Sequence, residues 1–544
     1  MGAISCGREV DVIVVGAGFG GLYALHRLRT AGLELQVFEA AEGIGGTWYW
    51  NCYPGARCDV ESVEYSYSFS EELDQDWEWS ERYAAQPEIL RYIEHVADRF
   101  DLRKDIQLET RVTAARFDES VDRWTVETDD GRRHTAQFLV MTAGCLSIPN
   151  VPDLPGLESF AGRVLHTGRW PQHGVDFEGQ QVAVFGTGSS GIQVIPEIAR
   201  QADHVSVLQR TANYSMPAGN GPLDPEYVRE LKARYPEHRE AARQSFFGNG
   251  IVEVGDGSAL DVSDEERRRE FDRRWALGGA AWVMTAYNDL IVDEAANAKL
   301  VDYVHSKIEE MVGDPETAHL LCPTGYPAGT KRVCQHTDYY DAYNRDDVTL
   351  IDLRTAPVTA VVPDGLQLAD GRTIEAQSIV FATGFDAITG SLLAIDIQGR
   401  GGRQLRDKWA DGPRNYLGLM VAGFPNLFTV TGPGSPSVLS NMVMAIEQHV
   451  DLIADLVIHL RELGLVTVEA GKDAEDAWVE HVNEVAHATL YPRTDSWYMG
   501  ANIPGKPRVF LPYVGGIVSY RVKCEEVVAR GYEGFLLSGT SVTA

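Results

Sequence analysis

Two glycine-rich turns, each set between a strand pattern and a helix pattern, constrain the fold of this chain more than any other feature. The first turn, residues 16–21, follows a β-branched run at residues 10–15, and a second apolar run at 35–38 ends at Glu39. The second turn, residues 186–191, follows a run at 181–185 and precedes a helical stretch to residue 200 and a strand pattern at 204–209. Strand, turn, helix and strand form a βαβ unit. The sequence therefore predicts an α/β fold with two Rossmann-like dinucleotide-binding domains.

Both turns have the G-x-G-x-x-G spacing, in which the first glycine permits the turn, the second lets a pyrophosphate approach and the third allows close helix packing. The residues expected to contact the two cofactors here are Gly16, Gly18 and Gly21 in the first turn and Gly186, Gly188, Ser189 and Gly191 in the second. The ends of the following strands differ. Glu39 offers a carboxylate to an unmodified ribose, whereas Arg210 and Thr211 offer a cation and a hydroxyl to a 2'-phosphate. The first site is predicted to bind FAD and the second NADPH.

A second repeat supports two nucleotide-binding domains. Asp130-Gly131 and Asp370-Gly371 are turn signals, and each is followed by a strand pattern that ends at a small residue, Gly144 or Gly384. Residues 222–313 are instead rich in helix formers, with a helix start at Ser263, and a Pro-rich linker lies at 149–155. The expected divisions are the first part of the FAD domain at 1–148, the first part of the NADP domain at 149–217, a helical insertion at 218–330, the second part of the NADP domain at 331–380 and the C-terminal part of the FAD domain at 381–544.

Composition narrows the partners and the location. The chain has 79 acidic residues and 48 Lys and Arg, which gives a formal charge of -31. This charge disfavours binding to nucleic acid or to anionic membranes. Seven scattered cysteines without a C-x-x-C pair predict neither a disulfide framework nor a zinc ribbon, and no metal site is expected. Neither a long apolar run nor a signal-peptide pattern is present. A soluble, cytoplasmic protein, monomeric or weakly oligomeric, is expected.

Two dinucleotide sites indicate that a hydride passes from a nicotinamide to a flavin, and leave open what the reduced flavin does next. In the disulfide reductases, two cysteines with four residues between them follow a glycine-rich segment and receive the electrons. Here Thr47 is followed by Trp48, and Cys52 and Cys58 have five residues between them. The disulfide-reductase interpretation therefore lacks its key residues.

At residues 160–171 the sequence matches F-x-G-x-x-x-H-x-x-x-W-P without a mismatch, through Phe160, Gly162, His166, Trp170 and Pro171. This pattern, with a second one at residues 45–59, resembles the flavin-dependent Baeyer-Villiger monooxygenases. The likeness extends from Val10 to Gly534 and is greatest to the group with phenylacetone, steroid and cyclohexanone monooxygenases. The resemblance implies that NADPH reduces FAD, that O2 adds to the flavin at C4a, and that this peroxyflavin converts a ketone to an ester or lactone, with sulfoxidation as a side activity.

The resemblance also assigns roles to residues. The catalytic arginine of the family falls on Arg332 and its aspartate partner on Asp59, and a guanidinium suits an anionic oxygen because its charge does not depend on pH. His166 and Trp170 are expected to position domains, and no catalytic role is given to Cys334 or His336. Other positions expected to contact FAD or NADPH are Thr47, Trp48, Lys331 and Trp497, and the residues expected to line the substrate pocket are Ser437, Val438, Leu439 and Met442.

Two other functions remain possible at this stage. A flavin monooxygenase that oxygenates amine or sulfide heteroatoms would share both nucleotide sites, and the complete fingerprint at 160–171 argues against it. A redox sensor or electron-transfer protein without its own substrate would need neither Asp59 nor Arg332. Which ketone is used, whether cyclic, aromatic, steroidal or linear, is not predicted.

Overall fold

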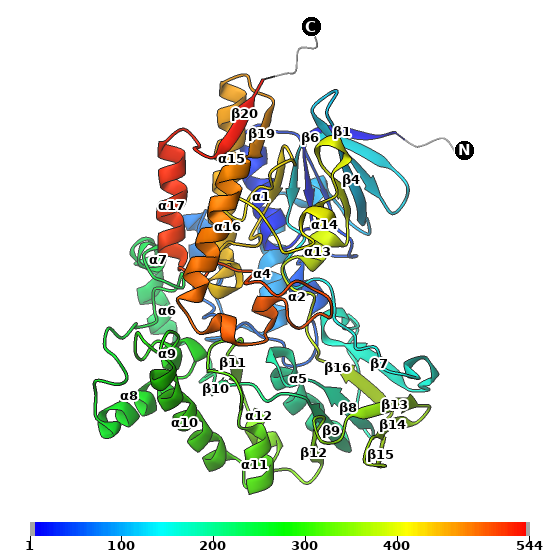
Figure 1. Cartoon of the computed structure of the whole chain (residues 1–544), viewed down its shortest axis with the longest axis vertical. Coiled ribbons are helices and arrows are strands. Elements are labelled where there is room, and N and C mark those ends of the chain that lie inside the picture. The colour runs from blue at the N-terminus through cyan, green and yellow to red at the C-terminus, as the bar shows by residue number, and fades with distance from the viewer. Residues whose placement is uncertain (1–5, 540–544) are drawn as a thin grey trace.

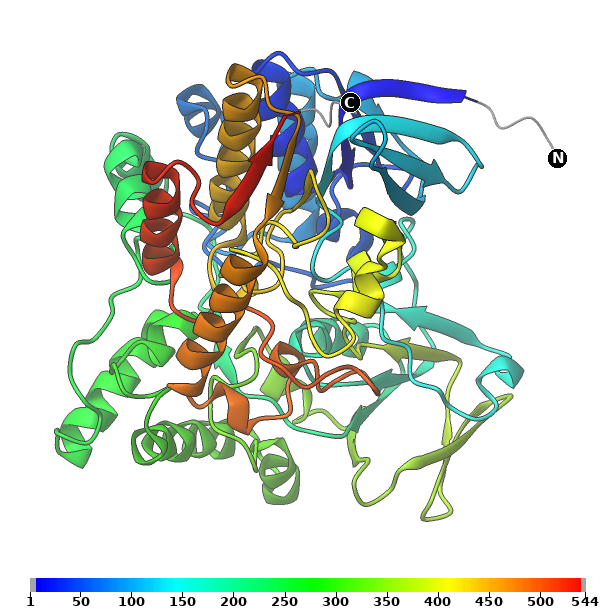
Figure 2. The same cartoon turned by 45° about the horizontal axis from the view of Figure 1, so that its top comes forward.

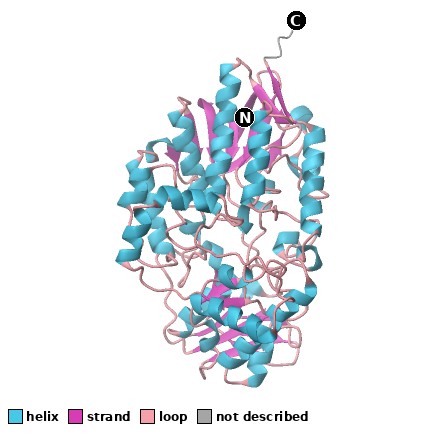
Figure 3. Cartoon of the chain, turned by 90° about the vertical axis from the view of Figure 1, so that its left-hand side faces the viewer, coloured by secondary structure: helices cyan, strands magenta, loops and turns pink. Residues whose placement is uncertain are grey.

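The computed structural model describes residues 6–539 and contains two main sheets, one toward each end of the molecule, with helices packed around them (Figures 1 and 3). Each sheet contains one of the predicted βαβ units with its parallel strand pair; in the first sheet β5 runs antiparallel to β4 and β6. The predicted α/β fold with two Rossmann-like domains is confirmed.

The first sheet has eight strands and contains the first glycine-rich turn. Its order is β17-β4-β5-β6-β1-β2-β3, with β18 paired to β6. Residues 12–14 of β1 are fully buried because α1 (Phe19–Thr30) and α15 (Met442–Glu462) cover one face and a second apolar cluster covers the other. The strands are β1 (Cys6–Val15), β2 (Leu35–Phe38), β3 (Ile106–Gln107), β4 (Val112–Asp118), β5 (Arg123–Thr128), β6 (Arg133–Met141), β17 (Asp396–Gln398) and β18 (Leu427–Thr429).

The second sheet has five strands and contains the second glycine-rich turn. Its order is β12-β9-β8-β16-β7, all parallel. Helix α5 (Ser189–Ala199) connects β8 to β9 and buries Ile192, Val194, Ile195 and Ile198. The strands are β7 (Arg163–His166), β8 (Gln181–Phe185), β9 (His204–Gln209), β12 (Val348–Asp352) and β16 (Ser378–Phe381).

The two repeats predicted around residues 130 and 370 differ in detail. In the first, Asp130-Gly131 connects β5 to a single long strand, β6. In the second, β13 (Val358–Val362), β14 (Gly365–Leu368) and β15 (Thr373–Glu375) form a separate small sheet, and the strand is interrupted at residues 376–377 before β16. At this interruption the Gln377 side chain contacts the start of β8, where its Oε1 accepts a hydrogen bond from the Gln181 backbone N–H at 2.7 Å.

The expected helical insertion lies between two short paired strands, β10 (Ser215–Pro217) and β11 (Cys334–His336). In Figures 1 and 2 its helices (green) lie on the side of the molecule opposite β13–β15. The predicted helix start at Ser263 is present as a capping box with Glu266. The helices are α6 (Pro225–Lys232), α7 (Tyr235–Arg243), α8 (Asp264–Leu277), α9 (Ala280–Met284), α10 (Glu294–Met311) and α11 (Pro315–Leu321). The boundaries of the five divisions stay predictions.

The C-terminal part returns to the first sheet. There β19 (Thr467–Ala470) pairs with β20 (Phe535–Ser538), and α15, α16 (Lys472–His487) and α17 (Ile517–Ala529) lie on that end of the molecule (Figure 1). Within residues 6–539, no helix is both long and apolar enough to cross a membrane. The remaining helices are α2 (Thr47–Trp50), α3 (Glu71–Asp76), α4 (Gln86–Arg99), α12 (Tyr339–Ala342), α13 (Gly390–Leu393) and α14 (Leu405–Lys408).

Candidate active site

A cavity of about 1160 Å³ lies where the carboxyl ends of the parallel strands of both sheets meet. Its wall includes the ends of β1, β2 and β6 from the first sheet and of β8, β9 and β16 from the second. In open α/β sheets this is the place where ligands bind. Both predicted nucleotide sites therefore open into one space.

The first glycine-rich turn contains two glycines that the fold itself requires. Gly16 has φ +106°, and a Cβ there would lie 2.6 Å from the Thr142 carbonyl oxygen. A Cβ on Gly21 would lie 1.9 Å from the Gly16 carbonyl oxygen, and Gly21 does not line the cavity. Gly18 does line the cavity, and the atom nearest to its Cβ position is Gly46 Cα at 3.3 Å. Gly16 and Gly18 therefore both line the space that a ligand would fill, and of the two only Gly18 has a Cβ position free of a clash with the fold itself.

The second turn repeats this arrangement. Gly186 has φ +100°, with the Ala382 carbonyl oxygen 2.6 Å from its Cβ position, and a Cβ on Gly191 would lie 2.1 Å from the Gly186 carbonyl oxygen. Around the Cβ position of Gly188, which lines the cavity, no atom of the described residues lies within 4 Å. Helices α1 and α5 both begin at these turns without a side-chain cap. Their first N–H groups are therefore available to bind an anionic group in the cavity.

The carboxylate of Glu39 is buried at the end of β2 and lines the cavity. It accepts hydrogen bonds from the backbone N–H groups of Ala17 at 2.8 Å and Ala41 at 2.9 Å. These bonds hold the side chain against the first turn. Because a carboxylate can accept about four hydrogen bonds, capacity remains for a ribose hydroxyl.

Arg210, Thr211 and Lys331 line the cavity beside the second turn. The Lys331 ammonium lies over the Tyr326 ring, 4.6 Å from its centroid. Burial lowers the pKa of Lys331, and the positive charge of Arg210 lowers it further. In the part of the chain that the structure describes, neither cation forms an ion pair. The cluster is therefore an unneutralised positive patch, suited to a phosphate.

Arg332 and Asp59 meet across the cavity wall, although 273 residues separate them in the sequence. Nε and Nη2 of Arg332 both donate to Oδ2 of Asp59, at 2.9 and 2.6 Å. The third bond goes from Nη1 to the Val438 carbonyl oxygen at 2.7 Å. The charge of Asp59 is the main reason that the pKa of Arg332 is raised. This site therefore keeps a fixed positive charge at any physiological pH.

We compared the chain with known protein families, sequences and structures. The model of the flavin-binding monooxygenase-like family matches residues 9–220. Acetone monooxygenase (methyl acetate-forming) of Gordonia sp. strain TY-5 is 43% identical, over 97% of this chain and 99% of that protein. A structure of oxidized steroid monooxygenase bound to NADP has a TM-score of 0.93 and 51% identity, covering 97% of this chain and 99% of that one. This chain belongs to the Baeyer-Villiger monooxygenase family. A further relative at 42% identity, over 97% of this chain and 96% of its own, is phenazine N-monooxygenase PhzNO1 of Lysobacter antibioticus.

The fingerprint residues Phe160, Gly162, His166 and Trp170 do not line the cavity. They belong to or flank β7, the edge strand of the second sheet. His166 is buried, its Nδ1 accepts from the Gly168 N–H at 2.9 Å, and burial lowers its pKa to about 4. A Cβ on Gly162 would lie 2.3 Å from the Gln377 carbonyl oxygen. These contacts fix the backbone around β7, and the structural role of the fingerprint stays a prediction.

Arg169, at a position inside the fingerprint that had no predicted role, does reach the cavity. Arg169 lines it, and its guanidinium lies 4.2 Å from the centroid of the Trp50 ring. Nη2 of Arg169 donates to the Ser147 carbonyl oxygen at 2.8 Å. Arg169 therefore connects the second sheet to the first domain and to the segment before the linker. It occupies a variable position of the pattern, so no motif indicated it.

The other predicted contacts divide into two groups. Thr47, Trp48, Trp497, Val438 and Met442 line the cavity; Ser437 and Leu439 do not. The Ser437 side chain is instead fully buried, and the residue has φ +43°. The Trp48 Nε1–H donates to the Tyr65 hydroxyl at 3.1 Å.

The two residues without an assigned role, Cys334 and His336, are both buried. Sγ of Cys334 lies 3.2 Å from Oγ of Ser189 and accepts from Nδ2 of Asn213 at 3.0 Å. Burial raises the pKa of this thiol to about 11, so it stays protonated at neutral pH. Cys334 therefore packs behind the coenzyme turn as a neutral thiol.

Proposed function

We propose that the protein is a monooxygenase that binds FAD at the first glycine-rich turn and NADPH at the second, and that uses O2 to convert ketones to esters or lactones. The observation that carries this proposal is the Arg332–Asp59 pair, which stands in the same cavity as both turns. A protein that only transferred or sensed electrons would have no use for this fixed charge beside its flavin site.

The residues present fit both cofactors. The FAD pyrophosphate would lie on Gly18 and the uncapped start of α1, with its ribose at Glu39 and Thr47 and Trp48 along its length. The NADPH pyrophosphate would lie on Gly188 and Ser189, and the coenzyme's 2'-phosphate among Arg210, Thr211 and Lys331, with Trp497 at the nicotinamide nucleotide. When bound, FAD would supply the reactive oxygen, with electrons from NADPH and oxygen from O2.

The positive charge of Arg332 stabilises negative charge that forms on a substrate oxygen during the reaction. A ketone carbonyl that is attacked becomes an oxyanion, and a preorganised charged donor lowers the energy of such a state. Arg332 has five N–H donors, three of which are used by Asp59 and Val438, so two remain for oxygen atoms in the cavity. Asp59 fixes the plane of the guanidinium, which Val438 holds from the other side.

The same argument favours ketones over amines. When an amine nitrogen is oxygenated, positive charge develops on the nitrogen, and Arg332 would oppose it. The phenazine N-monooxygenase relative makes amine oxygenation the alternative to test.

The deciding experiment measures NADPH consumption with cyclic, aromatic, steroidal and linear ketones and with a tertiary amine and a thioether, products being identified by mass. Addition of one oxygen atom to a ketone, giving an ester or lactone, is expected. Consumption with N-oxide as the sole oxygenated product would overturn the ketone assignment.

A further inference from the structure

Residues 434–442 run past the cavity beside Arg332, and we call them the Val438 loop. Val438 accepts the Arg332 hydrogen bond, and Val438, Ser440 and Met442 line the cavity. The beginning of the loop is held by backbone bonds to the C-terminal part, since Gly434 N–H donates to the Leu511 carbonyl oxygen at 2.7 Å. The contacts at the other end of the loop therefore affect the position of Val438 and of the Arg332 guanidinium that it binds.

Asn441 holds that other end. Its backbone N–H donates to the Phe247 carbonyl oxygen at 2.8 Å, and its Nδ2 donates to the Glu64 carbonyl oxygen at 2.8 Å. Its Oδ1 accepts from the Val443 N–H at 3.1 Å and so caps α15. The residue is only 2% exposed. Asn441 thus joins the loop to the helical insertion through its backbone N–H, and to the first domain through its side chain.

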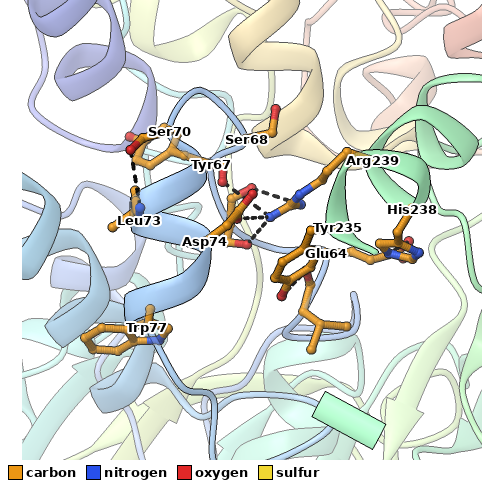
Figure 4. A network of polar contacts seen from close by, with 12 residues as sticks. Glu64, Tyr67, Ser68, Ser70, Leu73, Asp74, Trp77, Tyr235, His238 and Arg239 are labelled. Atoms are coloured by element: carbon orange, nitrogen blue, oxygen red, sulfur yellow. Dashed lines mark hydrogen bonds and ion pairs between the residues drawn. The ribbon is translucent and has the colours of Figure 1, made fainter. Parts of the chain in front are cut away.

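Glu64 extends the connection into the insertion. Its carboxylate oxygen Oε1 accepts from the Gly250 N–H at 2.5 Å and lies 3.1 Å from Nε2 of His238 on α7. Figure 4 shows Glu64 and His238 side by side at this helix. Glu64 therefore bonds to the Gly250 segment of the insertion and contacts α7 through its side chain, and it bonds to Asn441 through its carbonyl oxygen.

Helix α7 is in turn fixed to the first domain by Arg239. Nη2 of Arg239 donates to Oδ1 of Asp74 and to Oγ of Ser66, both at 2.7 Å. Figure 4 shows the Arg239 guanidinium directed at Asp74. The Arg239 and Asp74 side chains are 7% and 8% exposed. A buried ion pair of this kind is costly to separate, so the insertion has a fixed position.

We propose that Asn441 is a positioning residue for the reaction, through which the helical insertion sets the place of the Val438 loop and hence of Arg332. The inference rests on the proposed function for its catalytic consequence, while the loop's dependence on Asn441 can be measured without turnover. A donor at Nδ2 is required, because the partner is a carbonyl oxygen.

The test compares Asn441→Asp with Asn426→Asp in the FAD-containing protein. The carboxylate introduced by Asn441→Asp would keep the helix cap and lose the donor to Glu64. Asn426 is a matched control, because it is also buried, its Nδ2 donates to the Val466 carbonyl oxygen and its Oδ1 accepts from the Val468 N–H, and it does not line the cavity. Hydrogen exchange of residues 434–443, the Michaelis constant for the ketone and the ester formed per NADPH are measured.

In Asn441→Asp, exchange in the loop should rise about tenfold, as expected for one lost buried hydrogen bond, and the Michaelis constant for the ketone should rise by a similar factor. The ester formed per NADPH should fall. Asn426→Asp should match the wild type in all three. If both variants lose thermal stability alike and neither changes loop exchange, the Michaelis constant or the ester yield, Asn441 is structural only. If the wild type makes no ester from any ketone, the proposed function fails, and loop exchange still tests the inference.

Discussion

Arg332 places two of its nitrogen atoms on one oxygen of Asp59, with Nε at 2.9 Å and Nη2 at 2.6 Å. The second Asp59 oxygen takes no part in this contact, so the guanidinium is held edge-on and its remaining donors are free for the cavity. The pair is half-buried, with 33% of the arginine side chain and 26% of the aspartate side chain exposed. The guanidinium therefore has a fixed orientation as well as a fixed positive charge.

Arg332→Ala should separate oxygenation from NADPH consumption. Loss of one preorganised charged donor at an oxyanion lowers the rate by about a hundredfold to a thousandfold. NADPH should still be oxidised, with hydrogen peroxide released in place of ester. Asp59→Ala should act in the same direction more weakly, because Val438 still holds the guanidinium. Ester and peroxide are quantified for each variant; ester formation by Arg332→Ala at near the wild-type rate would contradict the role of this residue.

Much of the fold was predictable because its signals are local. A β-branched run, a glycine turn and a helix pattern lie within about thirty residues in each βαβ unit, and both units form as expected. The interruption at residues 376–377 was not predictable from local pattern, and the Gln377 side chain there bonds to a strand 196 residues away.

The site was predictable only where a motif or the family resemblance pointed to it. The Arg332–Asp59 contact spans 273 residues, and no periodicity connects the two. Arg169 and Asn441 match no cofactor motif, and their roles follow from which backbone carbonyl each reaches. Sequence patterns report on neighbours along the chain, whereas these contacts are made by the packing of domains.

Arg210→Ala and Lys331→Ala should each weaken the binding of NADPH and leave the binding of NADH nearly unchanged. Each cation can make a charge-assisted bond to a 2'-phosphate, worth roughly 1.5 to 3 kcal/mol, or about tenfold to a hundredfold in affinity. The Michaelis constants of both coenzymes are measured for each variant. Arg354→Ala is the control, because Arg354 is exposed and paired with Asp352 at the end of the neighbouring strand β12. Equal effects on NADH and NADPH would place the phosphate elsewhere.

Gly188→Ala and Gly191→Ala should fail for different reasons. No atom of the described chain lies within 4 Å of the Cβ position of Gly188, so this variant should fold, keep its flavin and bind NADPH poorly. A Cβ on Gly191 would lie 2.1 Å from a backbone oxygen, so that variant should give little folded protein. Yield, melting temperature, flavin absorbance and the NADPH Michaelis constant distinguish the two. Gly18→Val, the corresponding change at the first turn, should yield protein without flavin.

Arg239→Met should destabilise the protein strongly because it leaves Asp74 buried without a partner. Burial already raises the pKa of Asp74. Removal of one member of a buried pair costs about 3 to 5 kcal/mol of the free energy of unfolding. The double change Arg239→Met with Asp74→Leu should cost less than Arg239→Met alone, which urea unfolding of the three variants would show. A double variant less stable than Arg239→Met would indicate that packing, and not charge, dominates here.

His336 should make the protein sensitive to acid. Both ring nitrogens are buried without a partner among residues 6–539, and burial lowers the pKa from 6.5 to about 4. The folded state therefore keeps His336 neutral while the unfolded state takes up a proton below 6.5, so stability is lost as the pH falls from 6.5 toward 4. The loss should reach roughly 3 kcal/mol, at about 1.4 kcal/mol for each pKa unit. His336→Leu should remove the part of this slope that His336 contributes and so make the loss shallower, whereas His173→Gln, at an exposed histidine, should leave the slope unchanged. Melting temperatures of the three proteins across this range provide the measurement, and a constant difference between His336→Leu and the wild type at every pH would contradict the assignment.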